Sequence, residues 1–405
     1  MPNTELQHRT VRTLASAQVL NGIGVAGTVA AGSLLVSSIT DSETLAGLAQ
    51  TSSVLGAAAL ALPLARLTAQ GGRRLALSVG YVTGVFGSIF AIIGGAHKNL
   101  FFMLLGTFLV GAASAAGYQA RFAAIDLATK ESRAKQLSFV VWGSTIGAVA
   151  GPNLMDPAGN LAEFLKLPRL VGPYIVSATT LLLATIVIQA FLRPDPYLTA
   201  EKQASITQHK GSTKEALAHI RSNPTALFAI SAIAIGHVAM VSVMVMTPIH
   251  MAHVDVTLRV IGFVISVHVL GMYVFSPLVG SLSDRLGRIR VIQLGLIILL
   301  SSTVIAGTSA ADNAIQLGIG LFLLGLGWSC TLIAGSAFLS ESVSLEMRPA
   351  SQGASDLVMN LSGAGGGALA GVIIGTLNYG WLCLFAAIPV LFLALISIKV
   401  NNYAK

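Results

Sequence analysis

Residues 280–288 read Gly-Ser-Leu-Ser-Asp-Arg-Leu-Gly-Arg, a short charged turn between two long apolar segments. The segments cover 258–283 and 289–309. Each is long enough to cross a bilayer, which takes about 20 mostly apolar residues. A segment in lipid must satisfy its own backbone hydrogen bonds, so it is helical. The stretch therefore predicts two membrane-spanning helices joined by a tight turn.

Apolar segments of similar length continue in both directions from this hairpin. We expect helices at 12–37, 43–68, 75–95, 99–125, 136–155, 170–192, 225–250, 258–283, 289–309, 313–338, 351–377 and 379–399. The polar stretch 193–224 divides them into six and six. The prediction is an all-α membrane protein of twelve transmembrane helices, with a six-helix bundle over 1–192, a central loop over 193–224 and a second six-helix bundle over 225–405.

The composition excludes a soluble globular protein. Of the 405 residues, 54% are apolar and 10% are charged, whereas about 25% of an ordinary soluble domain is charged. No Gly-Lys-Ser/Thr loop for nucleotide phosphates is present. Nothing points to covalent catalysis, so we do not expect an enzyme or a permanently bound cofactor. Cys330 and Cys383 lie in apolar segments and are expected to be reduced and buried.

The charge pattern favours a bilayer over a nucleic acid as the partner. The net charge is +8, but the basic residues are scattered through the connections between apolar segments. Most of the 24 lysines and arginines lie on one expected side, together with both termini and the central loop. The positive-inside rule predicts that this side is cytoplasmic. We expect a multi-pass protein of the cell inner membrane, a monomer, whose first apolar segment is not a cleaved signal.

The two halves of the chain repeat each other at an offset near 215 residues. The dipeptide Gly72-Arg73 returns as Gly287-Arg288, and the pattern Gly-x-Phe-x-x-Gly at 106–111 returns at 320–325. Glu-x-Arg at 131–133 returns at 346–348. Such a duplication predicts a substrate site between the halves, near the middle of the membrane.

The motif and the repeat together resemble those of a known family. Residues 280–288 are similar to the Gly-x-x-x-Asp-Arg-x-Gly-Arg signature of the major facilitator superfamily, whose members have this six-plus-six plan. The resemblance covers the whole chain and implies a secondary transporter that works by alternating access. In the first half the signature is degraded, because Ala65, Ala69 and Gln70 stand where Gly, Asp and Arg are expected.

The charged groups around the two turns are candidates for a gate. An Asp-Arg pair on a glycine-bounded turn can dock on neighbouring helix ends and hold one face shut. In the second half the candidates are Asp284, Arg285, Arg288 and Glu341. In the first half Asp126 is expected to pair with Arg66 or Arg73. The alternative is that these charges only anchor loops at the headgroups.

Methionines and histidines are concentrated between residues 237 and 272. The residues His237, Met240, Met244 and Met251 follow helical steps along one face, and His268 and Met272 share a face of the next helix. Thioether and imidazole ligands suit Cu(I). We predict a copper pathway with Met240, Met244, His268 and Met272 as ligands and His237 as an auxiliary ligand. His250 and His253 are candidates for an entry relay, with solvent-exposed histidines as the alternative.

These pairs resemble those of the CcoA-like bacterial copper importers, a family that borders on riboflavin transporters. The resemblance implies copper uptake as the first choice of function, with copper as cargo. The alternative is a proton-coupled transporter of a small organic molecule, either riboflavin uptake or drug efflux, in which the methionines only line a cavity. A non-transporting sensor is disfavoured, because no soluble domain exists beyond the central loop.

Two ionisable residues inside the apolar segments are functional candidates of their own. Arg121 and Asp356 are costly inside lipid. Arg121 is expected to pair with Asp126 or with an anionic substrate, and Asp356 to carry a coupling proton. Since both are predicted near helix ends, plain anchoring is the alternative. Glycines spaced by four at 143–151 and 363–375 predict smooth faces for close helix packing.

Overall fold

The computed structural model describes residues 2–41, 45, 47–204, 213–252 and 257–403. Within these ranges the secondary structure is helical, without a strand. The chain forms two compact units. Unit 1 comprises 1–128, 139–213 and 345–360, and unit 2 comprises 129–138, 214–344 and 361–405.

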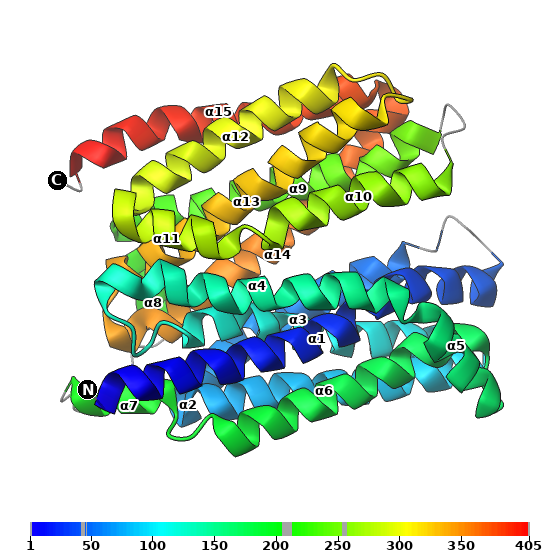
Figure 1. The fold of residues 1–405 in the computed structure, drawn as a ribbon, viewed down its shortest axis with the longest axis horizontal. Coiled ribbons are helices and arrows are strands. Elements are labelled where there is room, and N and C mark those ends of the chain that lie inside the picture. Colours follow the sequence, from blue (N-terminus) through cyan, green and yellow to red (C-terminus); the bar gives the residue numbers. More distant parts are fainter. Residues whose placement is uncertain (1, 42–44, 46, 205–212, 253–256, 404–405) are drawn as a thin grey trace. The chain divides into compact units, whose positions relative to one another are not determined.

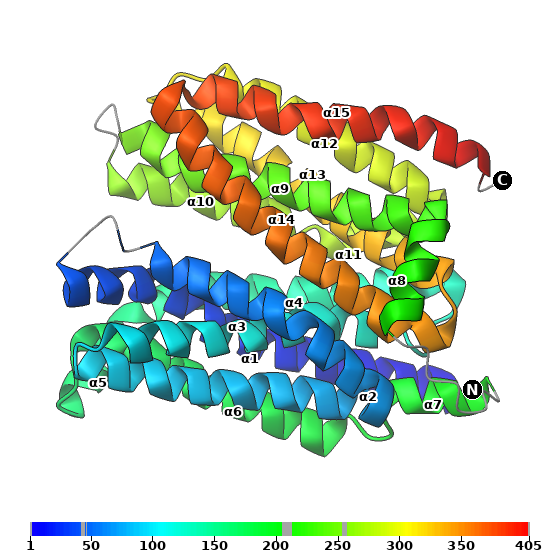
Figure 2. The ribbon, with the colours of Figure 1, turned by 180° about the vertical axis from the view of Figure 1, so that it is seen from behind.

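Unit 1 contains the helices of the first half of the chain. They are α1 (Pro2–Thr40), α2 (Leu48–Ala96), α3 (Leu100–Ala123), most of α4 (Arg133–Asn153), α5 (Met155–Phe164), α6 (Gly172–Phe191) and α7 (Pro196–Gln203), joined by the start of α14 (Arg348–Thr376). The helices α2 and α3 pack along their lengths, and α6 packs on α1 and α2 (Figures 1 and 2). The core between them includes Leu14, Leu77 and Tyr81.

Unit 2 contains the helices of the second half. They are α8 (Thr213–Ser222), α9 (Pro224–Ala252), α10 (Leu258–Tyr273), α11 (Ser276–Leu286), α12 (Arg288–Gly307), α13 (Ala314–Ser342), the rest of α14 and α15 (Tyr379–Tyr403). The helix α13 is central, since α9, α10 and α12 all pack on it. The helix α15 covers α12 and α9 (Figure 1).

The predicted twelve spans agree with the helices. By length and composition, ten helices of the described part can cross a membrane, and a bent pair formed by Lys130–Gly151 and Met155–Phe164 adds one more. The long α2 is broken at Gly72, where φ is 84° and ψ is 177°, so it comprises two of the predicted spans. Only glycine readily adopts this conformation.

Several helix boundaries differ from the predicted ones. The helix α1 begins at Pro2, ahead of the predicted start of the span at residue 12. The segment predicted at 258–283 is divided into α10 and α11 at Val274 and Phe275, ahead of Pro277. The central loop contains the short helices α7 and α8. Cys330 and Cys383 are free and buried, as expected.

Matching contacts in the two units support the predicted repeat. In unit 1, Gly111 packs directly on the backbone of Ser53 and Ala57. In unit 2, Gly325 packs in the same way on His268 and Met272, which lie 215 residues after Ser53 and Ala57. The two pairs of helices, α2 with α3 and α10 with α13, therefore have equivalent registers.

Candidate functional site

The signature turn of unit 2, residues 280–288, is built around Arg288. Asp284 accepts hydrogen bonds from the backbone N–H groups of Ala134 (3.1 Å) and Lys135 (2.8 Å), so its carboxylate caps the start of α4. Arg288 donates to Asp284 (2.7 Å) and to Glu341 (2.8 Å). One guanidinium thus joins the turn after α11 to the end of α13.

The remaining donors of Arg288 point to main-chain oxygens. They bind the carbonyl groups of Ser283 (2.8 Å) and Lys130. Gly287, with φ of 96°, lets the chain turn sharply before Arg288. Arg285 is exposed, and the described residues give it no ion pair. The structure therefore brings Asp284, Arg288 and Glu341 together and leaves Arg285 outside the cluster.

Unit 1 contains the counterpart of this cluster, almost fully excluded from water. Arg73 binds the two carboxylate oxygens of Asp126 through Nε (2.8 Å) and Nη2 (3.1 Å). The same Nη2 donates to Oε1 of Gln352 at the start of α14 (2.7 Å). The side chains of Arg73 and Asp126 are 1% and 0% exposed. Of the two predicted partners for Asp126, the structure selects Arg73.

A residue of the central stretch supports the break in α2. Asp195 accepts from the backbone N–H of Arg74 (2.7 Å) and caps α7 through the N–H groups of Tyr197 (3.0 Å) and Leu198 (3.2 Å). A Cβ on Gly72 would lie 2.5 Å from Cγ and Oδ2 of this carboxylate. Tyr197 then places its ring 5.8 Å from Cζ of Arg73. The turn of unit 1 is thus rebuilt with an acid from outside the signature.

The second buried ion pair of unit 1 joins Arg121 on α3 to Asp356 on α14. Nη2 of Arg121 lies 2.6 Å from Oδ1 of Asp356, and the side chains are 2% and 1% exposed. Oδ2 of Asp356 is buried and has no hydrogen-bond partner among the described residues. The pair unites two residues that were predicted as separate candidates, and the predicted alternative of Arg121 with Asp126 is not present.

The guanidinium of Arg121 is held on α3 by its own helix. Nη1 donates to the carbonyl of Tyr118 (2.7 Å), and Cζ lies 4.5 Å from the ring centroid of Phe122 and 5.8 Å from that of Tyr118. On α14, Nδ2 of Asn360 donates to the carbonyl of Asp356 (2.7 Å). The two charged groups are therefore positioned by different helices.

The candidate copper ligand His237 is bound to an indole. Nε1–H of Trp328 donates to Nδ1 of His237 (3.1 Å). An indole nitrogen only donates, so Nδ1 must be an acceptor. The other edge of the ring lies on Gly363, where a Cβ would be 2.6 Å from Cδ2 and 2.7 Å from Nε2. His237 thereby connects α9 to α13 and α14.

The other candidate ligands lie on two helices that scarcely contact each other. His268 is fully buried, and its Nδ1 pairs with the carbonyl of Leu321 on α13 (2.8 Å). Met240 and Met272 are buried, and Met244 is half-buried. Both α9 and α10 pack mainly on α13, with little contact between them. The helices that carry the predicted ligands are thus adjacent in sequence but largely separated by α13.

The histidines at the end of α9 have different positions. The ring of His250 stacks on Tyr379 of α15, with centroids 4.3 Å apart. His253, the other predicted relay residue, lies outside the described residues. Among the described residues no three His, Cys, Asp or Glu side chains gather to hold a metal.

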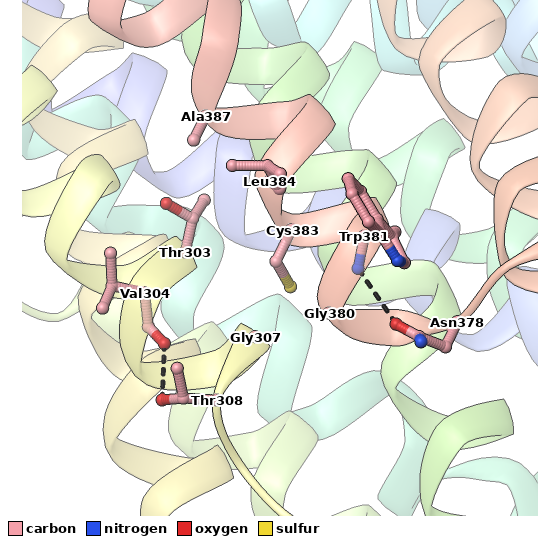
Figure 3. A pocket seen from close by; sticks show the side chains of 10 residues that line it. All are labelled: Thr303, Val304, Gly307, Thr308, Asn378, Gly380, Trp381, Cys383, Leu384 and Ala387. Atoms are coloured by element: carbon pink, nitrogen blue, oxygen red, sulfur yellow. Dashed lines mark hydrogen bonds between the residues drawn. The ribbon is translucent and has the colours of Figure 1, made fainter.

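A separate groove lies between α12 and α15 (Figure 3). It has a volume of about 390 Å³ and a mostly apolar lining that includes Val304, Cys383 and Leu384. Trp381 at its rim is about half exposed. None of the predicted site residues lines this groove.

Sequence reasoning missed several residues of these clusters. Asp195 stands before Pro196, a common N-cap signature that could have identified it. Gln352 is an amide in an apolar segment, a signal that was too weak by itself. Trp328 and Phe122 gave no signal, since aromatic residues are ordinary in membrane helices.

Comparison with known proteins gives a consistent family match. The sequence profile described as Major Facilitator Superfamily matches residues 14–257 and 235–402. The uncharacterised MFS-type transporter YdeG of Bacillus subtilis (strain 168) is 35% identical over 386 residues, which are 95% of this chain and 90% of that protein.

A more distant relative has a named cargo, and a solved structure shares the fold. The riboflavin transporter RfnT of Brucella anthropi is 26% identical over 359 residues, which are 89% of this chain and 87% of that protein. The Escherichia coli fucose:proton symporter FucP has a TM-score of 0.75 at 14% identity, over 96% of this chain and 98% of that chain.

Proposed function

Because the chain belongs to the Major Facilitator Superfamily, we propose that it is a secondary active transporter that couples the movement of a small organic molecule to that of a proton. The observation that carries this proposal is the buried ion pair of Arg121 and Asp356. Ionisable groups within membrane segments are rare and usually serve transport or proton transfer. The bilayer is the surrounding partner.

The repeat argues that this pair has a role beyond folding. Gly111 of α3 corresponds to Gly325 of α13 at an offset of 214, and at this offset the position equivalent to Arg121 is Gly335. At the offset of 215, the position equivalent to Asp356 is Val141 of α4. The equivalent helices of the repeat, α13 and α4, thus lack charges at these two positions. By contrast, the ion pair of Arg73 with Asp126 returns as that of Arg288 with Glu341.

The repeated clusters suit the gate of an alternating-access cycle. Each joins a helix turn to the end of another helix, through Arg73 in one unit and Arg288 in the other. Opening a face would break these charge-assisted hydrogen bonds, which are stronger than neutral ones. We assign the gate to these clusters, the transport halves to 1–192 and 225–405, and the cytoplasmic side to the termini.

Uptake into liposomes tests the proposal. The purified protein is reconstituted, a pH gradient is imposed, and a metabolite extract of bacterial cells is offered outside, with riboflavin added because of the relative RfnT. Mass spectrometry identifies compounds that accumulate only with the protein and only with the gradient. Asp356→Asn should abolish accumulation but keep equilibration, while the buried neighbour control Ser355→Ala should behave as wild type. A wild type that accumulates nothing, or an unaffected Asp356→Asn, contradicts the proposal.

Copper uptake is the second candidate, and one atom favours it. Nε2 of His268 is buried without a hydrogen-bond partner among the described residues, and Met272 follows one turn later on α10. An imidazole nitrogen next to a thioether suits Cu(I). The relatives YdeG and RfnT give copper no support, since the name of YdeG states no cargo and that of RfnT states riboflavin.

Radioactive copper uptake by whole cells separates the two candidates. The copper hypothesis expects uptake by the wild type that is lost in the Met244→Leu, His268→Ala double variant. Met103→Leu is the matched control, because Met103 is a buried methionine of unit 1. Wild-type cells that take up no copper, under conditions where a known importer does, would eliminate this candidate.

A further inference from the structure

We infer that the transported molecule is an organic anion, which replaces Asp356 on the guanidinium of Arg121 while the coupling proton resides on Asp356. The inference rests on the proposed proton coupling and adds the charge class of the substrate. It assigns Arg121 as the binding group and Asp356 as the proton carrier. The substrate ion would bear a carboxylate, phosphate or sulfonate.

The geometry of the Arg121–Asp356 pair would allow an anion to replace Asp356 on Arg121. Asp356 uses only Oδ1 toward Arg121, at 2.6 Å, and its Oδ2 is buried without a hydrogen-bond partner in the described part of the chain. Arginine and carboxylate groups often form two parallel hydrogen bonds, as Arg73 does with Asp126. The single contact here is therefore weaker than a two-contact pair with an incoming anion.

Arg121 is also placed to stay while its partner changes. Its Nη1 is bound to the carbonyl of Tyr118 and its Cζ lies over the ring of Phe122, both on α3. Asp356 lies on α14. A small movement of α14 relative to α3 within unit 1 would separate the charges without moving the guanidinium. Tyr118 is half-buried, whereas Arg121, Phe122 and Asp356 are buried. We therefore place the substrate's approach beside Tyr118.

Charge balance selects an anion among the possible coupled substrates. The resting pair is neutral, and an uncompensated buried charge costs several kcal/mol. A bound anion adds one negative charge, which protonation of Asp356 removes. A cation would pair with Asp356 and leave Arg121 uncompensated, because arginine does not lose its proton in proteins. A neutral substrate with a proton would leave the site positive.

The other charged and titratable groups near Asp356 do not supply a different balance. Arg121 acts on Asp356 from α3, and Arg73 acts on it more weakly from α2. Arg73 is already paired with Asp126. Among the described residues, the hydroxyl of Tyr118 is a further titratable neighbour of the pair. Among these groups, it is therefore protonation of Asp356 that keeps the site neutral when an anion binds.

The liposome assay tests this inference through the charge of the transported compounds. We expect every compound that depends on the wild-type protein to be an anion, and we expect Arg121→Gln to abolish its equilibration as well as its accumulation. Asp356→Asn should abolish only the accumulation. The matched control is Arg169→Gln, which removes an exposed arginine of unit 1 that pairs with Asp156.

The driving force gives a second, independent readout. A monoanion that moves with one proton carries no net charge, so one unit of pH gradient should concentrate it about tenfold. A membrane potential set with valinomycin and potassium should not alter that ratio. A neutral compound moving with one proton would instead respond by about 50-fold per 100 mV.

The outcomes separate this inference from the proposed function. Accumulation of a neutral compound such as riboflavin, dependent on Asp356 and sensitive to potential, overturns the anion and leaves proton-coupled transport intact. The same holds for accumulation of an anion that persists in Arg121→Gln. A wild type that accumulates no compound at all overturns both. Only Arg121-dependent, potential-insensitive accumulation of monoanions supports the inference.

Discussion

Ala65 of α2 packs directly on Gly353 of α14, where a Cβ would lie 2.5 Å from the Cβ of Ala65. The repeat of this contact is Gly280 on Ser138. The glycine of the contact therefore lies on α14 in unit 1, but on α11, the helix of the signature, in unit 2. The degraded signature lost its glycine at position 65, and the opposing helix supplies one at position 353 instead, so the close approach of the two helices is kept.

Exchanging the two residues should test this compensation. Gly353→Ala places two methyl groups in the space of one, and we expect it to lower the stability of the fold by about 1–3 kcal/mol. The Ala65→Gly, Gly353→Ala double variant should recover much of the loss, since it recreates the arrangement of the other unit. Thermal unfolding of the purified variants in detergent measures both. A double variant less stable than Gly353→Ala would contradict the compensation.

The absence of an acid at position 69 has a similar explanation. In unit 2, Asp284 caps α4 through the N–H groups of Ala134 and Lys135. The offset of 215 maps Asp284 to Ala69 and Ala134 to Pro349. Proline has no N–H, so the start of α14 presents one donor fewer and has less need of the carboxylate.

Pro349→Ala should therefore create a need for an acid at position 69. The new buried N–H would lack a partner, and we expect a loss of about 1–3 kcal/mol in stability. Adding Ala69→Asp should restore about 0.5–2 kcal/mol by capping that N–H, whereas Ala69→Asp alone should not stabilise the wild type. The same unfolding assay applies. Stabilisation by Ala69→Asp alone would show that proline is not the reason.

Much of the fold followed from local sequence, whereas the partners of the charged groups did not. Apolar length predicted the spans, and the offset of 215 predicted equivalent contacts such as those of Gly111 and Gly325. The pairing of Arg121 with Asp356 joins residues 235 positions apart. It depends on how α3 and α14 are rotated about their own axes, and two weakly amphipathic membrane helices do not reveal this.

The methionine and histidine cluster also shows that spacing along the sequence does not reveal contacts between helices. Spacing placed His237 with Met240 on one face of α9, but it did not reveal that Trp328 of α13 occupies Nδ1 of the histidine. It also treated α9 and α10 as neighbours because they are consecutive. The chain instead places α13 against both. Adjacency in sequence was an unreliable guide to adjacency in space for these helices.

The buried pair of Arg73 and Asp126 should be far more important for stability than an exposed pair. Asp126→Asn or Arg73→Gln leaves a buried partner uncompensated, and we expect each to cost about 3–5 kcal/mol. Arg169→Gln, at a pair that is 45% and 90% exposed, should cost less than about 1 kcal/mol. Chemical or thermal unfolding compares them, with folding checked by gel filtration. Equal losses at the two pairs would contradict the assigned burial.

The last prediction concerns the two glycines that precede the paired arginines. Gly72 and Gly287 have φ of 84° and 96°, a region that side chains rarely adopt. A Cβ on Gly287 would meet no atom within 4 Å, so Gly287→Ala should cost only backbone strain of about 1–3 kcal/mol. A Cβ on Gly72 would lie 2.5 Å from the carboxylate of Asp195, so Gly72→Ala should cost more.

Asp195 accounts for that difference if the close contact is its cause. Gly72→Ala should also displace the carboxylate from the N–H of Arg74 and from the cap of α7. In an Asp195→Ala background the space is open, and Gly72→Ala should then cost about as much as Gly287→Ala does in the wild type. Unfolding of the four variants measures the coupling. A cost of Gly72→Ala that is unchanged by Asp195→Ala would mean that backbone strain alone sets it, and that Asp195 does not support the turn of unit 1.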